Sequence, residues 1–281
     1  MKALFDVPAP AKLNLFLHVT GRREDGYHLL QSAFMLIDWC DTLHFERRSD
    51  GHVHRHDLGT TLPDDDLITR AAALLKKTAN TPLGADISID KRIPAQAGMG
   101  GGSSDAASTL LALNRLWQLD WPLNRLEQLG LQLGADVPFF LRGHNAWIEG
   151  VGEQITPLEL PSARFCIIKP RAGLETASIF RHPQLERSTK PATIAVFAAD
   201  PYGFGHNDLQ PVAELLCPEV TSALELFRAH GLQARMTGSG SAVFAHCAQG
   251  SVAIHTPDHW IVRECGNLEV HPLQGWASSD N

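Results

Sequence analysis

The chain has 281 residues, of which 44% are hydrophobic and 20% are charged. This composition is typical of a globular protein that is long enough for two modest domains with a shared cleft. The formal net charge of -7 argues against a general affinity for nucleic acid or for anionic membranes. No stretch resembles a membrane span or a signal sequence, so we expect a cytoplasmic protein whose partner is neither nucleic acid nor membrane.

The five cysteines are odd in number and scattered, and the chain contains no Cys-x-x-Cys pair. This usage fits reduced thiols in a core better than a disulfide framework. The sequence leaves the oligomeric state open.

The first predicted element is a strand over residues 11–20, where apolar residues alternate with others. Lys12 and Asn14 lie side by side on its second face, near the start of a strand that otherwise looks buried. A lone lysine at a strand start is usually solvated, and a functional role is the alternative.

A charged turn over residues 21–28, GRREDGYH, predicts a long hairpin tip because glycine lies near both ends. Tyr27 and His28 offer a flat ring and a hydrogen-bonding edge. That pair suits a nucleobase, although turns also carry such residues for ordinary packing.

More strand is predicted over residues 29–46, with a break near residue 40, in a mostly antiparallel sheet. Three histidines then alternate, His52, His54 and His56, and would share one face of a strand. A metal ion could use that spacing, but no fourth ligand is clearly placed, so a solvated edge strand is the preferred interpretation.

A helix is predicted over residues 64–80, because the segment begins with acids and ends with lysines as the helix dipole favours. A short strand over residues 85–93 then leads directly into the loop PAQAGMGGGSS, residues 94–104. The next segment, residues 105–119, has no Gly or Pro and places apolar residues at helical spacing. We expect this unit of strand, loop and helix to hold a phosphate.

The loop has the chemistry of an anion site. Gly98, Gly100, Gly101 and Gly102 lack Cβ atoms, so an oxyanion can approach several N–H groups at once, and the helix dipole adds to the attraction. No lysine follows the glycines as in the common phosphate-binding loop of nucleotide hydrolases, and Ser103 occupies the sixth position where a dinucleotide-binding loop needs Gly or Ala. A flexible surface loop is the alternative.

A further helix is predicted over residues 122–133, followed by Asp136 and a proline two residues later. From this local pattern alone, the simplest interpretation is that Asp136 caps the next segment. Strand segments follow as far as residue 158. We place a domain boundary there, which divides the chain into domains 1–160 and 161–281.

The second domain begins with a buried strand and a segment that contains Thr176 and Phe180. A second glycine and serine cluster, residues 238–241, interrupts a strand pair, and a tight hairpin explains it almost as well as a ligand does. The tail after Leu273 is expected to be disordered.

Five segments together resemble one protein family in their order and spacing. They are PAKLNLFL, GRREDGYH, PAQAGMGGGSSDAA, LGADVPFFL and MTGSGSAVFA. Over nearly its whole length the chain resembles the GHMP small-molecule kinases, and within them the branch that serves the non-mevalonate route to isoprenoids. The glycine loop indicates only the superfamily, whereas KLNL, DGYH and GADVPFF are specific to that branch. The resemblance implies an α+β fold of two domains with a cleft between the lobes.

The resemblance implies ATP-dependent phosphorylation of the C2 hydroxyl in the cytidine diphosphate ester of methylerythritol. Asp136 would be the catalytic base toward that hydroxyl. Lys12 would keep Asp136 ionised and neutralise the charge that builds in the transition state, and Asn14 would help to place the substrate.

The same resemblance assigns the binding residues. The cytosine would lie between Tyr27 and Phe180, with His28 at its polar edge and Thr176 nearby, and residues 238–241 would close the site. The nucleotide would contact the loop residues Pro94, Ala95, Gln96, Ala97, Gly98, Met99, Gly100, Gly101, Gly102, Ser103 and Ser104.

Magnesium is implied as the metal that phosphoryl transfer from ATP requires, without an assigned protein ligand. Asp105 is interpreted either as a carboxylate that interacts favourably with the helix dipole in the first turn or as a group near the metal, rather than as a phosphate ligand. Two residues depart from the family pattern. Met99 replaces a leucine, and Asp66 replaces an asparagine that is common at this position in the family, where a contact to the adenine is implied.

Two alternatives stay open at this stage. One is a different GHMP kinase, acting on mevalonate, homoserine or a sugar, but those substrates carry no base for the DGYH turn and Phe180. The other is a nucleotide-binding protein without activity, which would need neither Lys12 nor Asp136.

Overall fold

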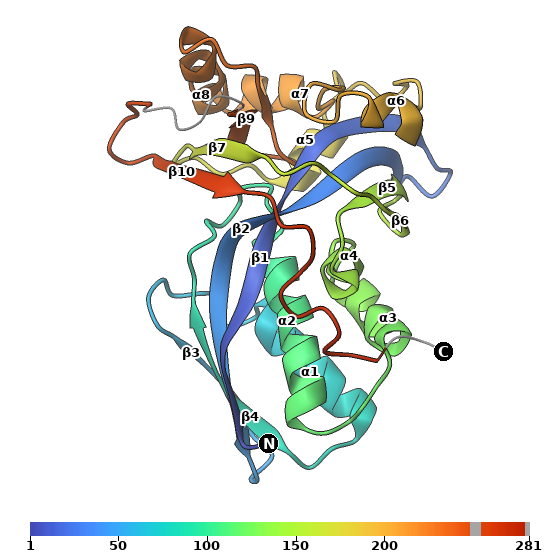
Figure 1. Cartoon of the computed structure of the whole chain (residues 1–281), viewed down its shortest axis with the longest axis vertical. Helices are drawn as coiled ribbons and strands as arrows, with labels where there is room; N and C mark the ends of the chain where they lie inside the picture. Colours follow the sequence, from blue (N-terminus) through green and yellow to red (C-terminus); the bar gives the residue numbers. More distant parts are fainter. Residues whose placement is uncertain (248–253, 279–281) are drawn as a thin grey trace.

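Two β-sheets divide the protein into two lobes (Figure 1). The structure is a computed structural model that describes residues 1–247 and 254–278. The first lobe contains a sheet of strand order β3-β4-β2-β5-β6, in which β1 also pairs with β2, and the second lobe contains the sheet β10-β7-β9-β8. The predicted α+β architecture with two lobes is confirmed.

The strands of the described residues are β1 (Ala3–Arg22), β2 (His28–Arg48), β3 (Val53–Asp57), β4 (Gly84–Asp90), β5 (Ala146–Gly150), β6 (Gln154–Pro157), β7 (Arg164–Lys169), β8 (Ala234–Met236), β9 (Val243–His246) and β10 (Ile261–Gly266). The helices are α1 (Leu67–Ala79), α2 (Gly101–Leu116), α3 (Leu123–Leu133), α4 (Val137–Arg142), α5 (Thr176–Arg181), α6 (Ile194–Ala198), α7 (Gln210–Leu216) and α8 (Pro218–Ala229).

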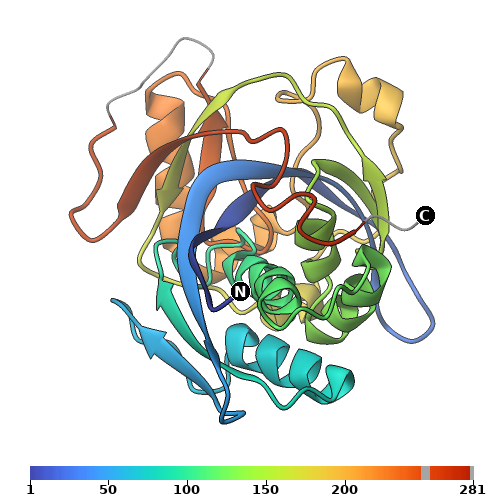
Figure 2. The ribbon, with the colours of Figure 1, turned by 60° about the horizontal axis from the view of Figure 1, so that its bottom comes forward.

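The antiparallel hairpin of β1 and β2 runs through both lobes (Figures 1 and 2). Its apolar residues enter three hydrophobic cores in turn: residues 7 and 9 enter the core of the first lobe, residues 11–16 a middle core, and residues 17 and 19 the core of the second lobe. The middle core also contains Trp147 of β5 and Phe165 of β7. The lobes are therefore joined by continuous apolar packing around one hairpin.

The predicted break near residue 40 is wrong, because β2 continues to Arg48. The sequence signal corresponds instead to a register shift, since Pro10 pairs with Cys40 whereas Lys12 pairs with Leu36. A bulge of this kind bends a strand without ending it.

Helix α2 begins four residues before the predicted start at residue 105. Gly100, with φ of 69°, is the residue before the helix, and Gly101 and Gly102 form its first positions. Ser103 and Ser104 therefore lie inside the first turn and do not cap it. Helix α1 begins after Asp66, whose carboxylate accepts a hydrogen bond from the Thr69 amide at 2.8 Å.

Strand β3 is the solvated edge strand that the sequence predicts. The His54 and His56 side chains are about half exposed and lie 3.7 and 3.2 Å from a carboxylate oxygen of Asp86. Within the described ranges, no cluster of three or more His, Cys, Asp or Glu could hold a metal ion.

None of the helices in those ranges has the length and hydrophobicity that a membrane crossing requires.

The chain passes from the first sheet to the second between β6 and β7, at the predicted boundary. We propose to keep that division for the lobes, with the C-terminal segment returning to the first. The prediction of disorder after Leu273 is wrong as far as residue 278: Trp276 packs against the first core, and Leu123 donates a backbone hydrogen bond to Ser278 at 3.0 Å. Figure 2 shows this segment crossing the helices of the first lobe. Residues 279–281 lie outside the described residues.

The packing of the C-terminal segment predicts that Leu273→Ala lowers the free energy of unfolding by about 2 to 5 kcal/mol. Leu273 is only 2% exposed, so its truncation would leave a cavity in the first core. Urea denaturation measures the change. The matched control is Leu131→Ala, where the side chain is 51% exposed, and we expect a change within about 0.5 kcal/mol. Equal effects of the two variants would contradict the described packing.

Candidate active site

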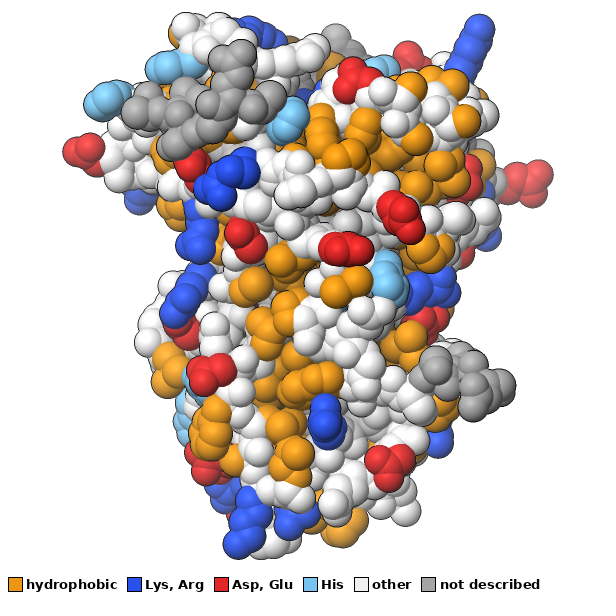
Figure 3. Space-filling view, in the orientation of Figure 1, with side chains coloured by type: hydrophobic (Ala, Val, Ile, Leu, Met, Phe, Trp, Pro, Cys, Tyr) orange, Lys and Arg blue, Asp and Glu red, His pale blue; other side chains and the backbone are white. Residues whose placement is uncertain are grey.

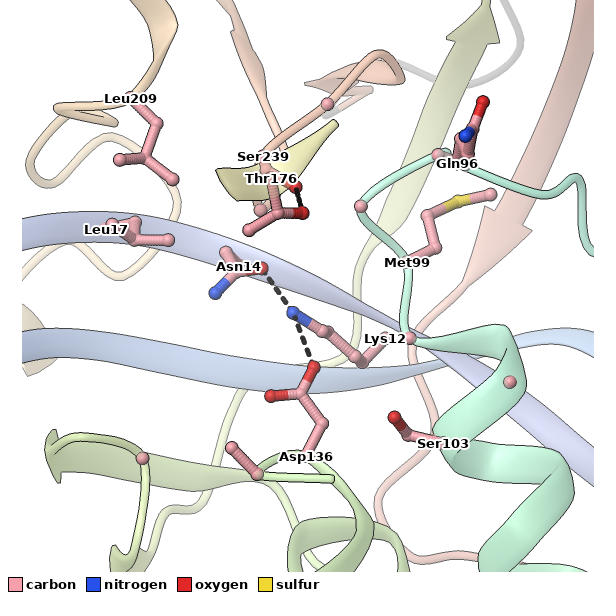
Figure 4. A pocket seen from close by; sticks show the side chains of 18 of the residues that line it. Lys12, Asn14, Leu17, Gln96, Met99, Ser103, Asp136, Thr176, Leu209 and Ser239 are labelled. Atoms are coloured by element: carbon pink, nitrogen blue, oxygen red, sulfur yellow. Dashed lines mark hydrogen bonds and ion pairs between the residues drawn. The ribbon is translucent and has the colours of Figure 1, made fainter. Parts of the chain in front are cut away.

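A cavity of about 1180 Å³ lies between the lobes and is lined by β1, β2, the glycine-rich loop, α5 and the loop at residues 238–240. Figure 3 shows the molecule narrowing between the lobes, and Figure 4 looks into the cavity. A single small ligand usually occupies a pocket of about 300 to 1000 Å³. The cavity is therefore large enough for two substrates side by side.

The cavity collects nearly all the residues that the sequence assigns to a site, although these come from segments far apart in the chain. Ser104 is the exception, because it is fully buried within α2. The predicted residues that line the cavity are Lys12, Asn14, Tyr27, His28, Pro94, Ala95, Gln96, Ala97, Gly98, Met99, Gly100, Gly101, Gly102, Ser103, Asp136, Thr176 and Phe180.

Lys12 is a buried lysine at the floor of the cavity. Its ammonium donates to Asn14 Oδ1 at 2.5 Å, lies 3.5 Å from Asp136 Oδ2 and sits 4.1 Å above the centre of the Phe34 ring. Figure 4 shows the first two contacts as dashed lines. Burial lowers the pKa of Lys12, and the negative charge of Asp136 opposes this shift. The lysine is thus held by partners from three elements rather than solvated.

Asp136 stands immediately before α4, but its side chain makes no capping hydrogen bond. The capping interpretation of the local sequence is therefore wrong. The carboxylate turns instead toward Lys12 and is 30% exposed to the cavity. A partly exposed carboxylate that faces a cavity can act as a general base.

The glycine-rich loop is held rigidly against the second lobe. Gly98 has φ of 71°, and a Cβ atom there would lie 2.1 Å from the carbonyl oxygen of Thr237, so only glycine fits. Backbone hydrogen bonds from Ser241 to Gln96 (3.1 Å) and from Ala242 to Ala97 (3.3 Å) fix the other side. The cluster at residues 238–241 is both a hairpin between β8 and β9 and a wall of the cavity.

Sequence reasoning missed Thr237 as a link between the two lobes. Its hydroxyl accepts the backbone N–H of Asn14 at 2.9 Å and donates to the Gly98 carbonyl at 3.2 Å. The side-chain amide of Asn14 (Nδ2) donates a separate hydrogen bond to the Ser32 hydroxyl at 3.0 Å. In the motif MTGSG the glycines are the local signal. The role of the threonine cannot be predicted from that motif, because its partner Asn14 is 223 residues away in the sequence.

Sequence reasoning also missed an ionic cluster behind the glycine-rich loop. Lys91 donates to Asp41 and, at 2.6 Å, to Asp105 Oδ2. Asp41 also accepts the backbone N–H groups of Arg92 and Ile93. Burial raises the pKa of Asp105 to about 8; Lys91 opposes this shift and Asp41 adds to it. Asp105 is thus a buried partner of Lys91.

Three aromatic residues, in the turn before β2, at the start of β2 and on α5, form what we call the aromatic end of the cavity. Tyr27 is 66% exposed in the hairpin turn. The His28 and Phe180 rings lie 5.0 Å apart with their planes 33° apart. The Thr176 hydroxyl is hydrogen bonded to the Ser239 hydroxyl at 2.7 Å, which joins α5 to the loop of the hairpin (Figure 4). Flat rings at an exposed edge provide a surface on which a base can stack.

The raised pKa of Asp105 predicts a stability that depends on pH. Between about pH 4 and pH 8 the folded chain retains a proton that the unfolded chain loses, so stability falls as pH rises through this range. Asp105→Asn cannot ionise, and we expect its loss of stability between pH 5 and pH 8 to be smaller than that of the wild type by about 1 to 3 kcal/mol. Urea denaturation at the two pH values measures this.

The exposed residue Asp120 provides the matched control, because Asp120→Asn also removes one carboxylate. This control is expected to follow the wild type. Parallel curves for the wild type and Asp105→Asn would contradict the protonation of Asp105.

Comparison with known proteins gives the same family in each case. The model of the GHMP kinases N terminal domain matches residues 66–144, and that of the GHMP kinases C terminal domain matches residues 196–254. The 4-diphosphocytidyl-2-C-methyl-D-erythritol kinase of Variovorax paradoxus (strain S110) is 61% identical over 99% of this chain and all of the relative. That of Albidiferax ferrireducens (strain ATCC BAA-621 / DSM 15236 / T118) is 62% identical over all of this chain and 98% of the relative.

The chain in a crystal structure of 4-(cytidine 5'-diphospho)-2C-methyl-D-erythritol kinase is 35% identical in sequence to this chain, with a TM-score of 0.76. The superposition covers 92% of this chain and 98% of the chain in the crystal structure. The family resemblance that the five sequence segments predict is confirmed. The chain belongs to the GHMP kinases and, within them, to the family of the 4-diphosphocytidyl-2-C-methyl-D-erythritol kinases.

Proposed function

We propose that this small-molecule kinase transfers the γ-phosphoryl group of ATP to the C2 hydroxyl of 4-diphosphocytidyl-2-C-methyl-D-erythritol. The names of its relatives support this acceptor. The observation that carries the proposal is the position of Lys12 and Asp136, which lie 3.5 Å apart in a cavity that the glycine-rich loop and the aromatic end also line. ATP at the loop and a cytidine ester at the aromatic end would meet at this pair.

The glycine-rich loop would bind the phosphates of ATP through backbone N–H groups. Helix α2 begins at Gly101, so its first N–H groups and its positive dipole end face the cavity. The loop would be in place before ATP arrives, because the hydrogen bonds to the hairpin at residues 238–241 already hold it. A preformed site costs little ordering entropy on binding.

The residues present also fit magnesium carried by ATP. Such an ion takes most of its ligands from phosphates and water and needs only one or two protein oxygens. The Ser103 hydroxyl is an oxygen ligand on the cavity wall and is the group that would hold it. When bound, magnesium neutralises charge on the β- and γ-phosphate oxygens.

Asp136 would accept the proton of the C2 hydroxyl as that oxygen attacks the γ-phosphoryl group. Lys12, 3.5 Å from the Asp136 carboxylate, would place a positive charge where negative charge develops on the transferred group. Asn14 holds the Lys12 ammonium at 2.5 Å, so the charge is oriented before the substrates bind. Asn14 would therefore act through Lys12 as well as on the substrate.

The aromatic end would bind the cytosine. Tyr27 and Phe180 would stack on its faces, and His28 would meet its polar edge, with Thr176 nearby. Stacking of this kind is worth about 1 to 3 kcal/mol per base. Mevalonate, homoserine and sugars carry no base, so this end of the cavity favours the cytidylyl acceptor over those of other GHMP kinases.

The acceptor is tested by measuring ADP release from ATP and magnesium with the cytidine diphosphate ester, mevalonate, homoserine, galactose or no acceptor. We expect turnover with the cytidine diphosphate ester alone. Turnover with another acceptor would contradict the cytosine pocket while keeping the roles of Lys12 and Asp136. Absence of turnover with all of them would favour a binding protein without activity.

Asp136→Asn should reduce turnover by about 10²- to 10⁴-fold, the usual contribution of a positioned general base. The affinity for ATP should change little, because the amide keeps the shape of the carboxylate and the loop is untouched. Steady-state kinetics and calorimetric titration with ATP measure the two effects.

The matched control for this variant is Asp258→Asn, which removes an exposed carboxylate from the second lobe. It should retain the turnover of the wild type. Intact turnover in Asp136→Asn would exclude Asp136 as the base.

A further inference from the structure

Arg187 joins the two halves of the aromatic end of the cavity. Its Nε donates to His28 Nε2 at 3.1 Å, which connects it to the start of β2. Its two Nη groups donate to backbone carbonyls at and after the end of α5: Nη1 to Leu185 at 2.9 Å, and Nη2 to Phe180 at 3.1 Å and His182 at 2.8 Å. All three guanidinium nitrogens are thus committed, which leaves the side chain one orientation.

This contact determines which nitrogen of His28 carries the proton. A guanidinium can donate hydrogen bonds but cannot accept them, so His28 Nε2 must present its lone pair to Arg187. The proton of the neutral ring then resides on Nδ1. Burial lowers the pKa of His28, and the positive charges of Arg187 and Arg22 lower it further, so the neutral ring is favoured at pH 7.

The Nδ1–H group is a donor that remains available to a ligand. Among the described residues, none accepts a hydrogen bond from it, and His28 lines the cavity beside Phe180. Cytosine presents a lone pair at ring position N3, whereas uracil presents an N–H at the same position. An N–H donor that faces this position therefore pairs with cytosine and opposes uracil.

We infer that Arg187 is a positioning residue that fixes His28 as the Nδ1–H tautomer and thereby makes the pocket prefer cytosine over uracil. The inference rests on the proposed function, because it assumes that the cytosine edge meets His28. Arg187 itself acts through His28 and need not touch the base. Its sequence position, 159 residues from His28, explains why no local pattern indicates the role.

The tautomer is measured directly in the wild type. Nitrogen NMR of the full chain, labelled with ¹⁵N in its 14 histidines, distinguishes the Nδ1–H tautomer, the Nε2–H tautomer and the charged ring. The His28 signal is assigned by its loss in His28→Gln. We expect the Nδ1–H tautomer at pH 7 to 8. An Nε2–H or a charged His28 would overturn the inference, and this arm does not depend on the folding of any Arg187 variant.

The consequence for binding is measured by calorimetric titration with cytidine 5'-diphosphate and uridine 5'-diphosphate, without catalysis. The wild type should prefer the cytidine compound. Arg187→Met removes every donor, so His28 can present either nitrogen, and the ratio of the two dissociation constants should fall by about 10-fold. Lys190→Met removes a positive charge from an exposed side chain in the same segment and should leave the ratio unchanged.

A purely structural role of Arg187 would give a different result. Displacement of Phe180 alone would weaken both diphosphates equally, so an unchanged ratio in Arg187→Met would overturn the inference, as would a wild type without preference. The proposed function is tested separately by turnover. Turnover with the cytidine diphosphate ester but no preference between the diphosphates would defeat the inference alone. Preference lost in Arg187→Met without any turnover would defeat the proposed function alone.

Discussion

The burial of the Lys12 ammonium is the constraint on which the rest of the site depends. A charge removed from water must be paired, because the unpaired charged form is costly inside a protein. Asn14 of the same strand and Asp136 before α4 supply the partners, and the Phe34 ring of β2 lies beneath. The backbone N–H of Lys12 also donates to the carbonyl of Met99 at 3.0 Å. Lys12 thereby contacts both the Asp136 carboxylate and the glycine-rich loop.

The two lobes act as one preorganised frame around this charge. A shared core at the middle of the β1–β2 hairpin joins them, and the Thr237 hydroxyl connects Asn14 to Gly98 directly. Such a frame suits phosphoryl transfer, in which the protein contributes placement and fixed charge rather than covalent chemistry. The hydrogen bond from Arg187 to His28 likewise holds the His28 ring in one orientation, so the aromatic end of the cavity is also preorganised.

Local patterns predicted the elements well where one segment decides its own structure. The alternation of residues 11–20, the glycine-rich loop and the helix that follows it are all present. The errors arose where a distant segment intervenes. The strand break near residue 40 became a bulge because β1 pairs across it. The tail is ordered as far as residue 278 because Trp276 packs against the first core. Asp136 precedes α4, but its carboxylate lies beside Lys12 and makes no capping hydrogen bond.

The sequence by itself determined the family, the two-lobed fold and the residue types of the site, because those depend on motifs whose members are neighbours in the chain. Only the tertiary structure decided which side chains form ion pairs and which ionisable groups hold a proton. Asp105 is 14 residues from Lys91, and His28 is 159 residues from Arg187. Protonation depends on burial and on the nearest charges, and these are set by the packing of segments that no local pattern relates.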